Sequence, residues 1–582
     1  MESAKIVYAI ADNIISGLGS DTTANADSVF AEKTGIGLVD DKRLYPEPFL
    51  AQHINDNDLE ESAIYRQTAN MHRLERLMIT SASKALSQTA VDTRSDNVVF
   101  IFSTTKGNIR LLEGSEKVPN DAFLDQLAKR VANFFGAANT PLVISNACIS
   151  GVLAQVTAIR LLKSGKYATA VIIGGDELTE FVISGFESFQ SVSAKPCKPY
   201  DANRDGLSMG EGVATLIVST DPSLAGEQRI MLAGGASSND ANHISGPSRT
   251  GDGIFFAIRN TMAEAEAEIS DIDLIDAHGT ATPYNDEMES KAIGLAGLNE
   301  VPLLSLKGYF GHTLGASGLL ETIICIECIR RGIRPRTLNF EQLGVPVNIN
   351  VSTSTGPAKL RTILKTASGF GGCNAAIVIS TEKSGKLYPP ETGSTTISTC
   401  TIADKNIWRN GDTVYTGNDS DDFGQFIRGA FKAIAQPYMK FSKMDDLCKL
   451  ALTAAEYLTE GENLADCGEE GVALLLGCRA SSLDTDLRHQ KVIEVKEPYM
   501  PSPAIFVYTL ANIMQGEICI RHKFKGENLC LVAGSKEECE NFLPGYADLL
   551  LAEGRAKKCI VGYADFLQGK YEAELKLIEK KP

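Results

Sequence analysis

The stretch VISNACISG, residues 143–151, places Cys148 between a strand-like apolar run and a helical segment. Its neighbours are small residues, which suit a sharp turn from strand to helix. At such a turn the helix N-terminus favours negative charge, so it lowers the pKa of a thiol and makes it a better nucleophile. The stretch therefore predicts a nucleophilic cysteine at the start of a helix. For a cysteine taken alone, a buried structural role is the alternative interpretation.

Two histidines follow in glycine-containing stretches. His278 lies in DAHGTATPYND (276–286), and His312 lies in LKGYFGHTLGASG (306–318), which also contains Lys307. Glycines beside the histidines allow the backbone to approach a substrate closely. One thiol, two imidazoles and a lysine together indicate the catalytic groups of an enzyme that forms carbon–carbon bonds.

The hydrophobic pattern alternates strand-like runs with helical stretches. IVYAIA, NVVFIFS and AVIIGG are strand-like, and residues 71–90, 122–135 and 151–165 are helical in character. Residues 228–382 repeat this style. The alternation predicts an α/β fold with mixed sheets covered by helices.

Residues 1–382 resemble β-ketoacyl-acyl carrier protein synthases of the elongating type. Besides the stretches above, the resemblance rests on CKPYDANRDGLSMGEG (197–212), DANHISGP (240–247) and SGFGGCN (368–374), in the order of the family. It implies a thiolase-like fold of two similar α/β halves with layered sheets and helices. The first half is expected at residues 1–230 and the second at residues 231–382.

The resemblance also implies roles for the catalytic residues. Cys148 would take the acyl group as a thioester, while His278 and His312 would donate hydrogen bonds to the thioester carbonyl of a malonyl group. Lys307 would order the site through Glu321, as a cation and not as a Schiff base.

Further positions match the family around these residues. Thr280 and Thr282 would lie along the phosphopantetheine arm, and Asp286 and Glu289 would support the site from behind. Phe370 would act as a gate between the acyl and malonyl sides, and its backbone N–H with that of Cys148 would form an oxyanion hole.

The activity so implied is a decarboxylative Claisen condensation of an acyl thioester with a malonyl-carrier protein, in fatty acid or polyketide-type (for example polyene) biosynthesis. No metal and no redox cofactor are expected, because phosphopantetheine arrives on the carrier protein. The expected partners are an acyl carrier protein and a second copy of the chain. One alternative is a thiolase-type enzyme, with Cys373 as its second cysteine. The other is a non-catalytic partner similar to a chain-length factor.

One departure from the family pattern concerns the acyl pocket. STTKGNIRLLEG (103–114) puts Lys106 about where the family has an apolar residue that reaches the floor of the acyl pocket. A charged floor would disfavour a long alkyl chain and suit a shorter, polar, aromatic or unsaturated acyl group.

The end of the chain repeats the pattern of its beginning. After a Gly-, Pro- and Ser-rich linker at 383–396, LLAEGRAKKCIVGYAD (550–565) matches LLKSGKYATAVIIGGD (161–176) at a constant offset, with Asp565 against Asp176. At the same offset Cys148 falls on Glu537. Residues 397–582 are therefore predicted to be a third, degenerate thiolase-like half without catalysis, with a structural, substrate-shaping or interaction role.

Composition limits the class of protein. The chain has 582 residues, a net charge of −17 and 13 cysteines. The negative charge disfavours nucleic acid as a partner, and no apolar run approaches the ~18 residues that cross a membrane. The N-terminus has no signal-peptide pattern, and unpaired cysteines favour the reducing cytoplasm. Cys325 and Cys328 form a C-x-x-C, but within TIICIECIRR they are expected to be helix core.

Overall fold

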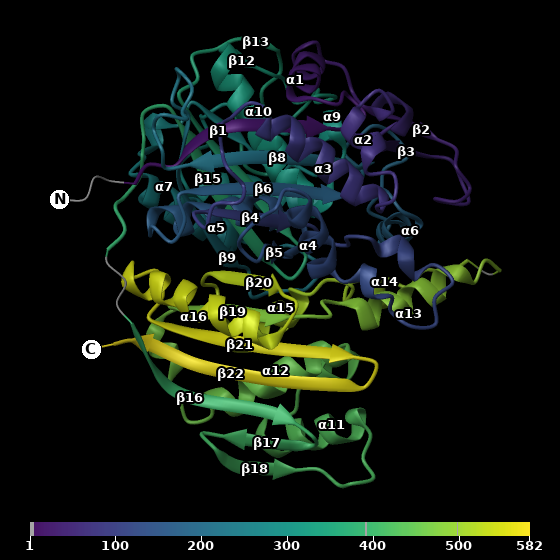
Figure 1. Cartoon of the computed structure of the whole chain (residues 1–582), viewed down its shortest axis with the longest axis vertical. Coiled ribbons are helices and arrows are strands. Elements are labelled where there is room, and N and C mark those ends of the chain that lie inside the picture. Colours follow the sequence, from purple (N-terminus) through teal and green to yellow (C-terminus); the bar gives the residue numbers. More distant parts are fainter. Residues whose placement is uncertain (1–4, 390–392, 498, 582) are drawn as a thin grey trace.

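The structure is a computed structural model that describes residues 5–389, 393–497 and 499–581. The chain forms a mixed α/β architecture in which three sets of strands follow one another along the sequence (Figure 1). In the first set, the strands Val98–Ser103 and Thr169–Asp176 are buried along their whole length, as expected for a sheet with helices on both faces.

The first set is built by the N-terminal part of the chain. Its order is β5-β4-β6-β8-β1, where β4 is parallel to β5 and β6, and β8 is antiparallel to β6 and β1. The strands span Tyr8–Ile15 (β1), Val98–Ser103 (β4), Leu142–Ile144 (β5), Thr169–Asp176 (β6) and Gly212–Ser219 (β8). Helix α3 (Arg73–Leu86) packs on β1 and β8.

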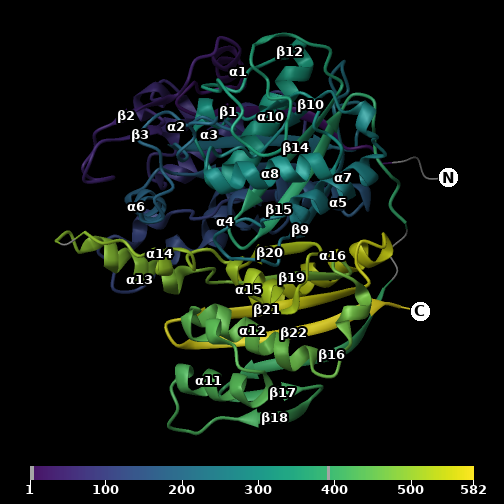
Figure 2. The same cartoon turned by 180° about the vertical axis from the view of Figure 1, so that it is seen from behind.

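The second set repeats this arrangement. Its order is β11-β10-β14-β15-β9, with the same parallel and antiparallel neighbours. The strands span Met231–Asn239 (β9), Leu274–Asp276 (β10), Leu303–Leu304 (β11), Thr362–Gly369 (β14) and Cys373–Ser380 (β15). Helices α7 (Asp252–Ala265) and α8 (Pro283–Leu295) pack together on the far side of this sheet (Figure 2).

Two buried helices lie between the first and second sheets. Helix α5 (Ser150–Lys163) contacts β4 and β6 of the first sheet as well as β9 and β15 of the second. Helix α10 (Ser317–Arg331) contacts β8 and β6 on one side and β14 on the other. Each helix is thus enclosed by sheet on two sides, and its N-terminus is held in the interior.

The third set has the same strand order again. It runs β20-β19-β21-β22-β16, with β19 parallel to β20 and β21, and β22 antiparallel to β21 and β16. The strands span Ser394–Ala403 (β16), Val472–Cys478 (β19), Asn528–Val532 (β20), Lys558–Leu567 (β21) and Lys570–Lys580 (β22). A hairpin of β17 (Asn406–Arg409) and β18 (Asp412–Thr416) extends its outer edge.

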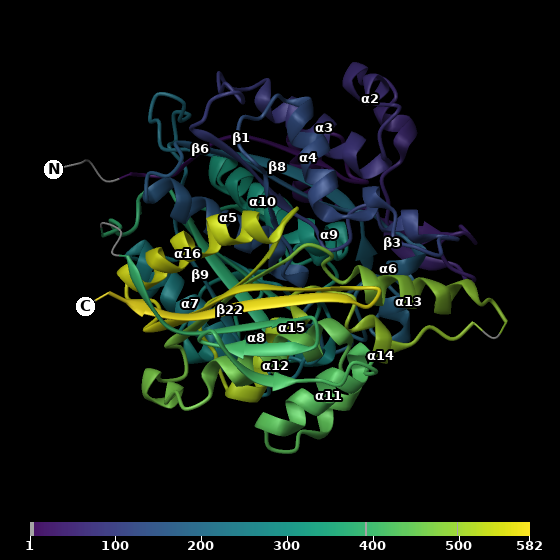
Figure 3. The ribbon, with the colours of Figure 1, turned by 60° about the horizontal axis from the view of Figure 1, so that its bottom comes forward.

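Helices cover both faces of the third sheet. Helix α12 (Asp446–Thr459) packs on β16, β21 and β22 together with α15 (Ile513–His522), and α11 (Phe423–Ile434) packs on α12. Helix α16 (Lys536–Ala552) packs on β19 and β21, and Figure 3 shows it on the other side of the sheet from α12. Two further helices, α13 (Leu483–Glu494) and α14 (Pro503–Phe506), leave this unit and lie against α6 (Glu180–Ser188) of the N-terminal part.

The third sheet joins the first at an edge. Strand β20 pairs antiparallel with β5, through Leu531 with Ile144 and Val532 with Val143. The two sheets therefore continue into one another within a single chain. The C-terminal unit thus packs directly against the N-terminal part of the chain.

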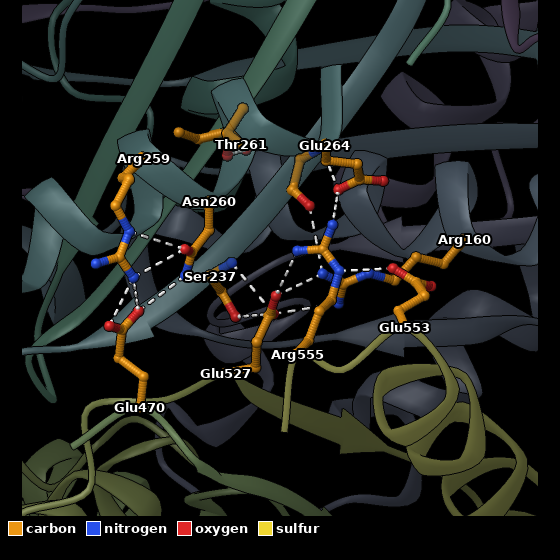
Figure 4. Close-up of polar contacts among 12 residues, drawn as sticks. Arg160, Ser237, Arg259, Asn260, Thr261, Glu264, Glu470, Glu527, Glu553 and Arg555 are labelled. Carbon is orange, nitrogen blue, oxygen red and sulfur yellow. Dashed lines mark hydrogen bonds and ion pairs between the residues drawn. The ribbon is translucent and has the colours of Figure 1, made fainter. Parts of the chain in front are cut away.

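Buried ion pairs hold this junction (Figure 4). Arg160 of α5 binds the Glu527 carboxylate at 2.6 Å, and Arg555 binds Glu527 at 3.3 Å and also contacts Glu264 of α7. The hydroxyl of Tyr388, in the segment before β16, donates a hydrogen bond to the same Glu264 carboxylate. One connected network of ion pairs and hydrogen bonds thus links α5, α7 and the C-terminal unit.

Among the residues described, the helices all fall short of the length and apolar character that crossing a membrane would require.

Candidate active site

Cys148 stands at the turn between β5 and the buried helix α5. The turn residues Ala147–Ile149 lead directly into α5 at Ser150, and Ala147 takes a left-handed backbone conformation with φ of 48°. A left-handed alanine is strained, and such strain is often found at functional turns. Cys148 is buried, with 9% of its surface exposed.

Both histidines point to the same place as the thiol. His312, which follows the short helix α9 (Lys307–Phe310), holds Nε2 3.0 Å from the Cys148 Sγ. His278 follows β10, and its ring centre lies 5.2 Å from that of His312. One ligand-type atom from each of the three residues lies within 4.8 Å of the others. Residues 1–230 and 231–382 thus each contribute to one cluster.

The electrostatics of the thiol differ from the sequence-based expectation. Burial raises the pKa of Cys148 to about 12, although the Lys307 cation and the backbone N–H groups of Cys148 and Phe370 oppose this shift. The position at a helix start was expected to lower the pKa. Enclosure between two sheets outweighs the helix terminus, so the resting group is a neutral thiol.

The two imidazoles are neutral for the same reason. Burial, followed by the Lys307 charge, lowers the pKa of His278 well below its usual value and that of His312 to about 3. The His278 Nδ1 is buried and has no hydrogen-bond partner among the residues that the structure describes. Since an unpaired buried N–H costs more than an unpaired ring lone pair, we assign the proton to Nε2. His278 then presents a hydrogen-bond donor to the cavity.

A buried charge network stands behind the histidines. The Lys307 ammonium binds the Glu321 carboxylate, and Glu321 also binds Lys365, which reaches Asp276 at 3.1 Å. The Lys307–Glu321 contact matches the sequence-based expectation of which groups meet. Lys365 and Asp276 were not predicted, although a lysine inside the apolar strand TILKTASG is an unusual pattern, since lysine is rarely buried unpaired.

The other residues that the family resemblance singled out lie in or near the loop that carries His278. Glu289 accepts hydrogen bonds from the backbone N–H groups of His278 at 2.8 Å and Gly279 at 2.7 Å. Asp286 accepts one from the Tyr200 N–H at 2.7 Å, and burial raises the pKa of its carboxyl to about 7. The hydroxyls of Thr280 and Thr282 lie 2.9 Å apart, and both residues line the cavity described next.

Two cavities meet at Cys148. The larger, of about 240 Å³, contains both histidines, Thr280 and Thr282, and reaches Tyr284, whose side chain is 76% exposed. The smaller, of about 20 Å³, lies on the other side of the thiol. Phe370 and Phe186 line both cavities, and their rings stack with centres 6.0 Å apart. Phe370 thus stands between the two spaces.

The C-terminal unit supplies part of the smaller cavity. Phe506 and Leu510 line it together with Lys106 of the N-terminal part. The Lys106 Nζ lies 3.0 Å from the Asp486 carboxylate of α13, and both side chains are almost fully buried. Asn512 donates a hydrogen bond to the Phe370 carbonyl at 2.8 Å. Sequence analysis missed these C-terminal residues, because nothing in their own segment marks them as part of a site.

Other cysteines are placed differently from Cys148. The Cys373 Sγ lies 3.3 Å from the Phe370 carbonyl and 3.5 Å from that of Asn146, and Cys373 is not among the residues that line either cavity at Cys148. Cys325 and Cys328 are buried within α10, and Cys325 contacts Asp276. Glu537, the position that aligns with Cys148, is in the first turn of α16.

Comparison with known proteins identifies the family. The sequence profile of the beta-ketoacyl synthase N-terminal domain matches residues 7–222, and that of the C-terminal domain matches residues 230–341. A mitochondrial protein of Schizosaccharomyces pombe, assigned as a 3-oxoacyl-[acyl-carrier-protein] synthase, is 28% identical over 363 residues, which are 56% of this chain and 83% of that protein. The 3-oxoacyl-[acyl-carrier-protein] synthase 2 of Coxiella burnetii is 31% identical over 252 residues, 41% of this chain and 61% of its own length.

Solved structures share the fold over a longer stretch. The structure titled PfaC Keto synthase-Chain length factor superposes with a TM-score of 0.77 at 15% identity, covering 99% of this chain and 78% of that one. A β-ketoacyl synthase from Burkholderia phymatum covers 65% of this chain and 99% of its own, with a TM-score of 0.58 and 22% identity. These neighbours confirm the predicted α/β, thiolase-like fold class.

Proposed function

The chain belongs to the β-ketoacyl synthase family of acyltransferases, and from this premise we propose a residue-level mechanism for a 3-oxoacyl-[acyl-carrier-protein] synthase. The observation that carries the proposal is the meeting of the Cys148 thiol with two neutral imidazoles between two cavities. One cavity would admit the carrier's phosphopantetheine arm and the malonyl group. The other would hold the acyl chain.

In the first step the acyl group moves from its carrier to Cys148. The Sγ attacks the thioester carbonyl, the bond to the carrier sulfur breaks, and the thiol proton leaves with the carrier thiol. His312 Nε2 lies 3.0 Å from the Sγ, and its N–H donates a hydrogen bond to this sulfur as the thiol proton passes to the leaving carrier sulfur. The backbone N–H groups of Cys148 and Phe370 stabilise the tetrahedral oxyanion.

In the second step a malonyl thioester enters the larger cavity and loses CO₂. The electron pair of the broken bond passes to an enolate, whose oxygen accepts hydrogen bonds from the Nε2–H groups of His278 and His312. The carbanion carbon attacks the acyl carbonyl, the bond to Cys148 breaks, and the Cys148 thiolate takes up one proton from water, which restores the neutral thiol. Besides burial, the positive charges of Lys307 and Lys365 lower the pKa of both imidazoles and so favour their neutral form.

We further propose an acyl carrier protein as the donor of both groups, and a third thiolase-like half in residues 397–582 that has no catalysis of its own. The shared strand order supports this third half, and so does Asp565. It accepts backbone N–H bonds from Arg479 and Ala480 at 2.9 and 2.7 Å, as Asp176 does from Thr105. The unpaired cysteines support a reducing compartment such as the cytoplasm.

Homodimerisation stays a prediction. It was expected because the family completes its acyl pocket across a subunit interface, but here the chain's own Phe506 and Leu510 reach the pocket and β20 already occupies the β5 edge. Light scattering of the purified protein would measure the oligomeric state directly.

Intact-mass spectrometry tests the central proposal. Incubation with short acyl thioesters of a carrier protein should add one acyl mass to the wild-type chain and none to Cys148→Ala. Addition of malonyl-carrier protein should then release a 3-oxoacyl product. If no acyl thioester loads the wild-type protein, the proposed function is wrong.

The Cys148, His278 and His312 set also contains ligand types that zinc accepts. We propose a metal-free reaction, because the imidazoles are needed as donors to an enolate oxygen. Elemental analysis of the purified protein and assay in the presence of EDTA test this proposal. Loss of loading on chelation would contradict it.

A further inference from the structure

The C-terminal unit fills the space where an acyl chain on Cys148 would extend. Phe506 stands at the end of α14, 5.6 Å from Phe186 and 6.2 Å from Phe181 between ring centres, and Leu510 follows one turn later. Phe506 is 3% exposed. With Phe506 in this position, the cavity beside the Cys148 thiol has a volume of about 20 Å³.

One of the residues that line this cavity carries a charge. Lys106 lines it, and its ammonium group binds Asp486 and the carbonyl of Thr509 and lies 5.0 Å from the Phe181 ring centre. His489 stacks edge-on against Phe181 at 4.6 Å. A longer alkyl chain on Cys148 would therefore press against Phe506 and Leu510 and against a buried ion pair whose hydrogen bonds it cannot replace.

We propose that residues 486–510 of the C-terminal unit restrict the acyl group on Cys148 to about the size of an acetyl or propionyl group. The inference rests on the proposed function, since it concerns the substrate of that site. A cavity of 20 Å³ exceeds only slightly the roughly 10–15 Å³ that one water occupies on the same measure. Room for one or two carbons beyond the carbonyl follows, and each further methylene needs a displaced side chain.

We expect this restriction to appear as a difference in the rate at which acyl groups of different length are transferred to Cys148. In an apolar pocket one methylene changes discrimination by roughly 10- to 200-fold. We expect acetyl to load Cys148 at least about tenfold faster than hexanoyl, and octanoyl to load more slowly still.

The experiment compares loading rates across a series of acetyl, butyryl, hexanoyl and octanoyl thioesters, measured by intact mass on the full chain. The decisive variant is Phe506→Ala, which opens the cavity. Phe542→Ala is the matched control, because Phe542 is also a buried aromatic residue of the C-terminal unit but packs against Tyr546, away from the cavity. Phe506→Ala should raise the hexanoyl-to-acetyl ratio by about tenfold or more, while Phe542→Ala keeps the wild-type ratio.

Two results would overturn the inference while leaving the function intact. These are a wild-type protein that loads octanoyl as fast as acetyl, and a Phe506→Ala variant with an unchanged ratio. Should Phe506→Ala fail to fold, Leu510→Ala replaces it with the same expected shift. Absence of loading with every chain length in the wild type would instead contradict the proposed function itself.

Discussion

Removal of the Asp486 carboxylate should strongly destabilise the attachment of the C-terminal unit. Lys106 and Asp486 come from the two parts of the chain, lie 3.0 Å apart, and have side chains only 4% and 5% exposed. In Asp486→Ala the ammonium group keeps the Thr509 carbonyl but loses its counter-ion. Breaking a buried pair by deleting one partner costs about 3–5 kcal/mol, because a buried charge is left uncompensated.

The structure offers an exposed pair for comparison. Lys491 and Glu116 also link the two parts, at 3.2 Å, but their side chains are 48% and 91% exposed. Glu116→Ala should therefore cost less than about 1 kcal/mol. A third variant, Lys106→Met with Asp486→Leu, removes both charges and should cost less than Asp486→Ala alone, since apolar replacements of a buried pair are often close to neutral.

Urea unfolding followed by circular dichroism measures these differences as shifts in midpoint at constant slope. A change in slope would indicate that the C-terminal unit detaches before the rest unfolds. If Asp486→Ala costs no more than Glu116→Ala, the pair is not the buried charge contact described here, and the argument that it stabilises the junction is refuted.

Three further predictions concern the catalytic cluster. Because burial raises the pKa of Cys148 to about 12, its alkylation by iodoacetamide should accelerate about tenfold per pH unit from pH 6 to 9; a plateau below pH 8 would contradict this. The pKa of His312 falls from 6.5 to about 3 on folding, so the unfolded state binds the extra proton. Acidification from pH 7 to 5 should therefore cost about 2 kcal/mol through His312, besides the cost through His278, whose pKa is also lowered. In urea titrations at the two pH values, His312→Asn should lose about 2 kcal/mol less than the wild type. Glu321→Gln leaves the Lys307 and Lys365 cations without their shared carboxylate, so malonyl decarboxylation by the purified variant should fall at least about tenfold, and a wild-type rate would show that the network is dispensable.

The catalytic cluster could be expected from sequence because its residues lie in short stretches with distinctive small neighbours. The glycines beside His278 and His312 mark loops where the backbone approaches other groups, and the small residues around Cys148 mark its turn. The direction of the thiol's pKa could not be predicted in the same way. The helix terminus is a local feature, whereas the desolvation that outweighs it comes from two sheets assembled from distant parts of the chain.

Less of the acyl side of the site could be predicted from the sequence. Lys106 was visible as a charge where an apolar residue was expected, but its partner is 380 residues away. Asp486 lies in LDTDLRHQK, a polar helix that reads as ordinary surface. A contact between two such segments depends on how the units dock, and docking is fixed by the β5–β20 edge and by the buried ion pairs around Glu527. Neither is encoded in a local pattern.

The C-terminal unit differs from the N-terminal part in how its strands are buried. In the first unit β8 is buried along its length, because α10 covers the face that α3 does not. The corresponding strand β22 alternates instead: Ala573, Leu575 and Leu577 are buried, whereas Glu572, Glu574 and Lys576 face the other side. Lys536 of α16 pairs with Glu572 and Glu574 there.

A second half would have to bury that charged face, at a large desolvation cost for its ion pairs. Because KYEAELKLIEK (570–580) alternates in this way, the third sheet cannot be layered against another sheet as the first two sheets are. The C-terminal unit instead meets the N-terminal part through the edge of β20 and through helices α13 and α14. It follows that the unit is specialised for docking on β5 and for reaching the acyl cavity. Charge reversal at Glu574, which removes its bond to Lys536, should lower stability without altering acyl selectivity, in contrast to Phe506→Ala.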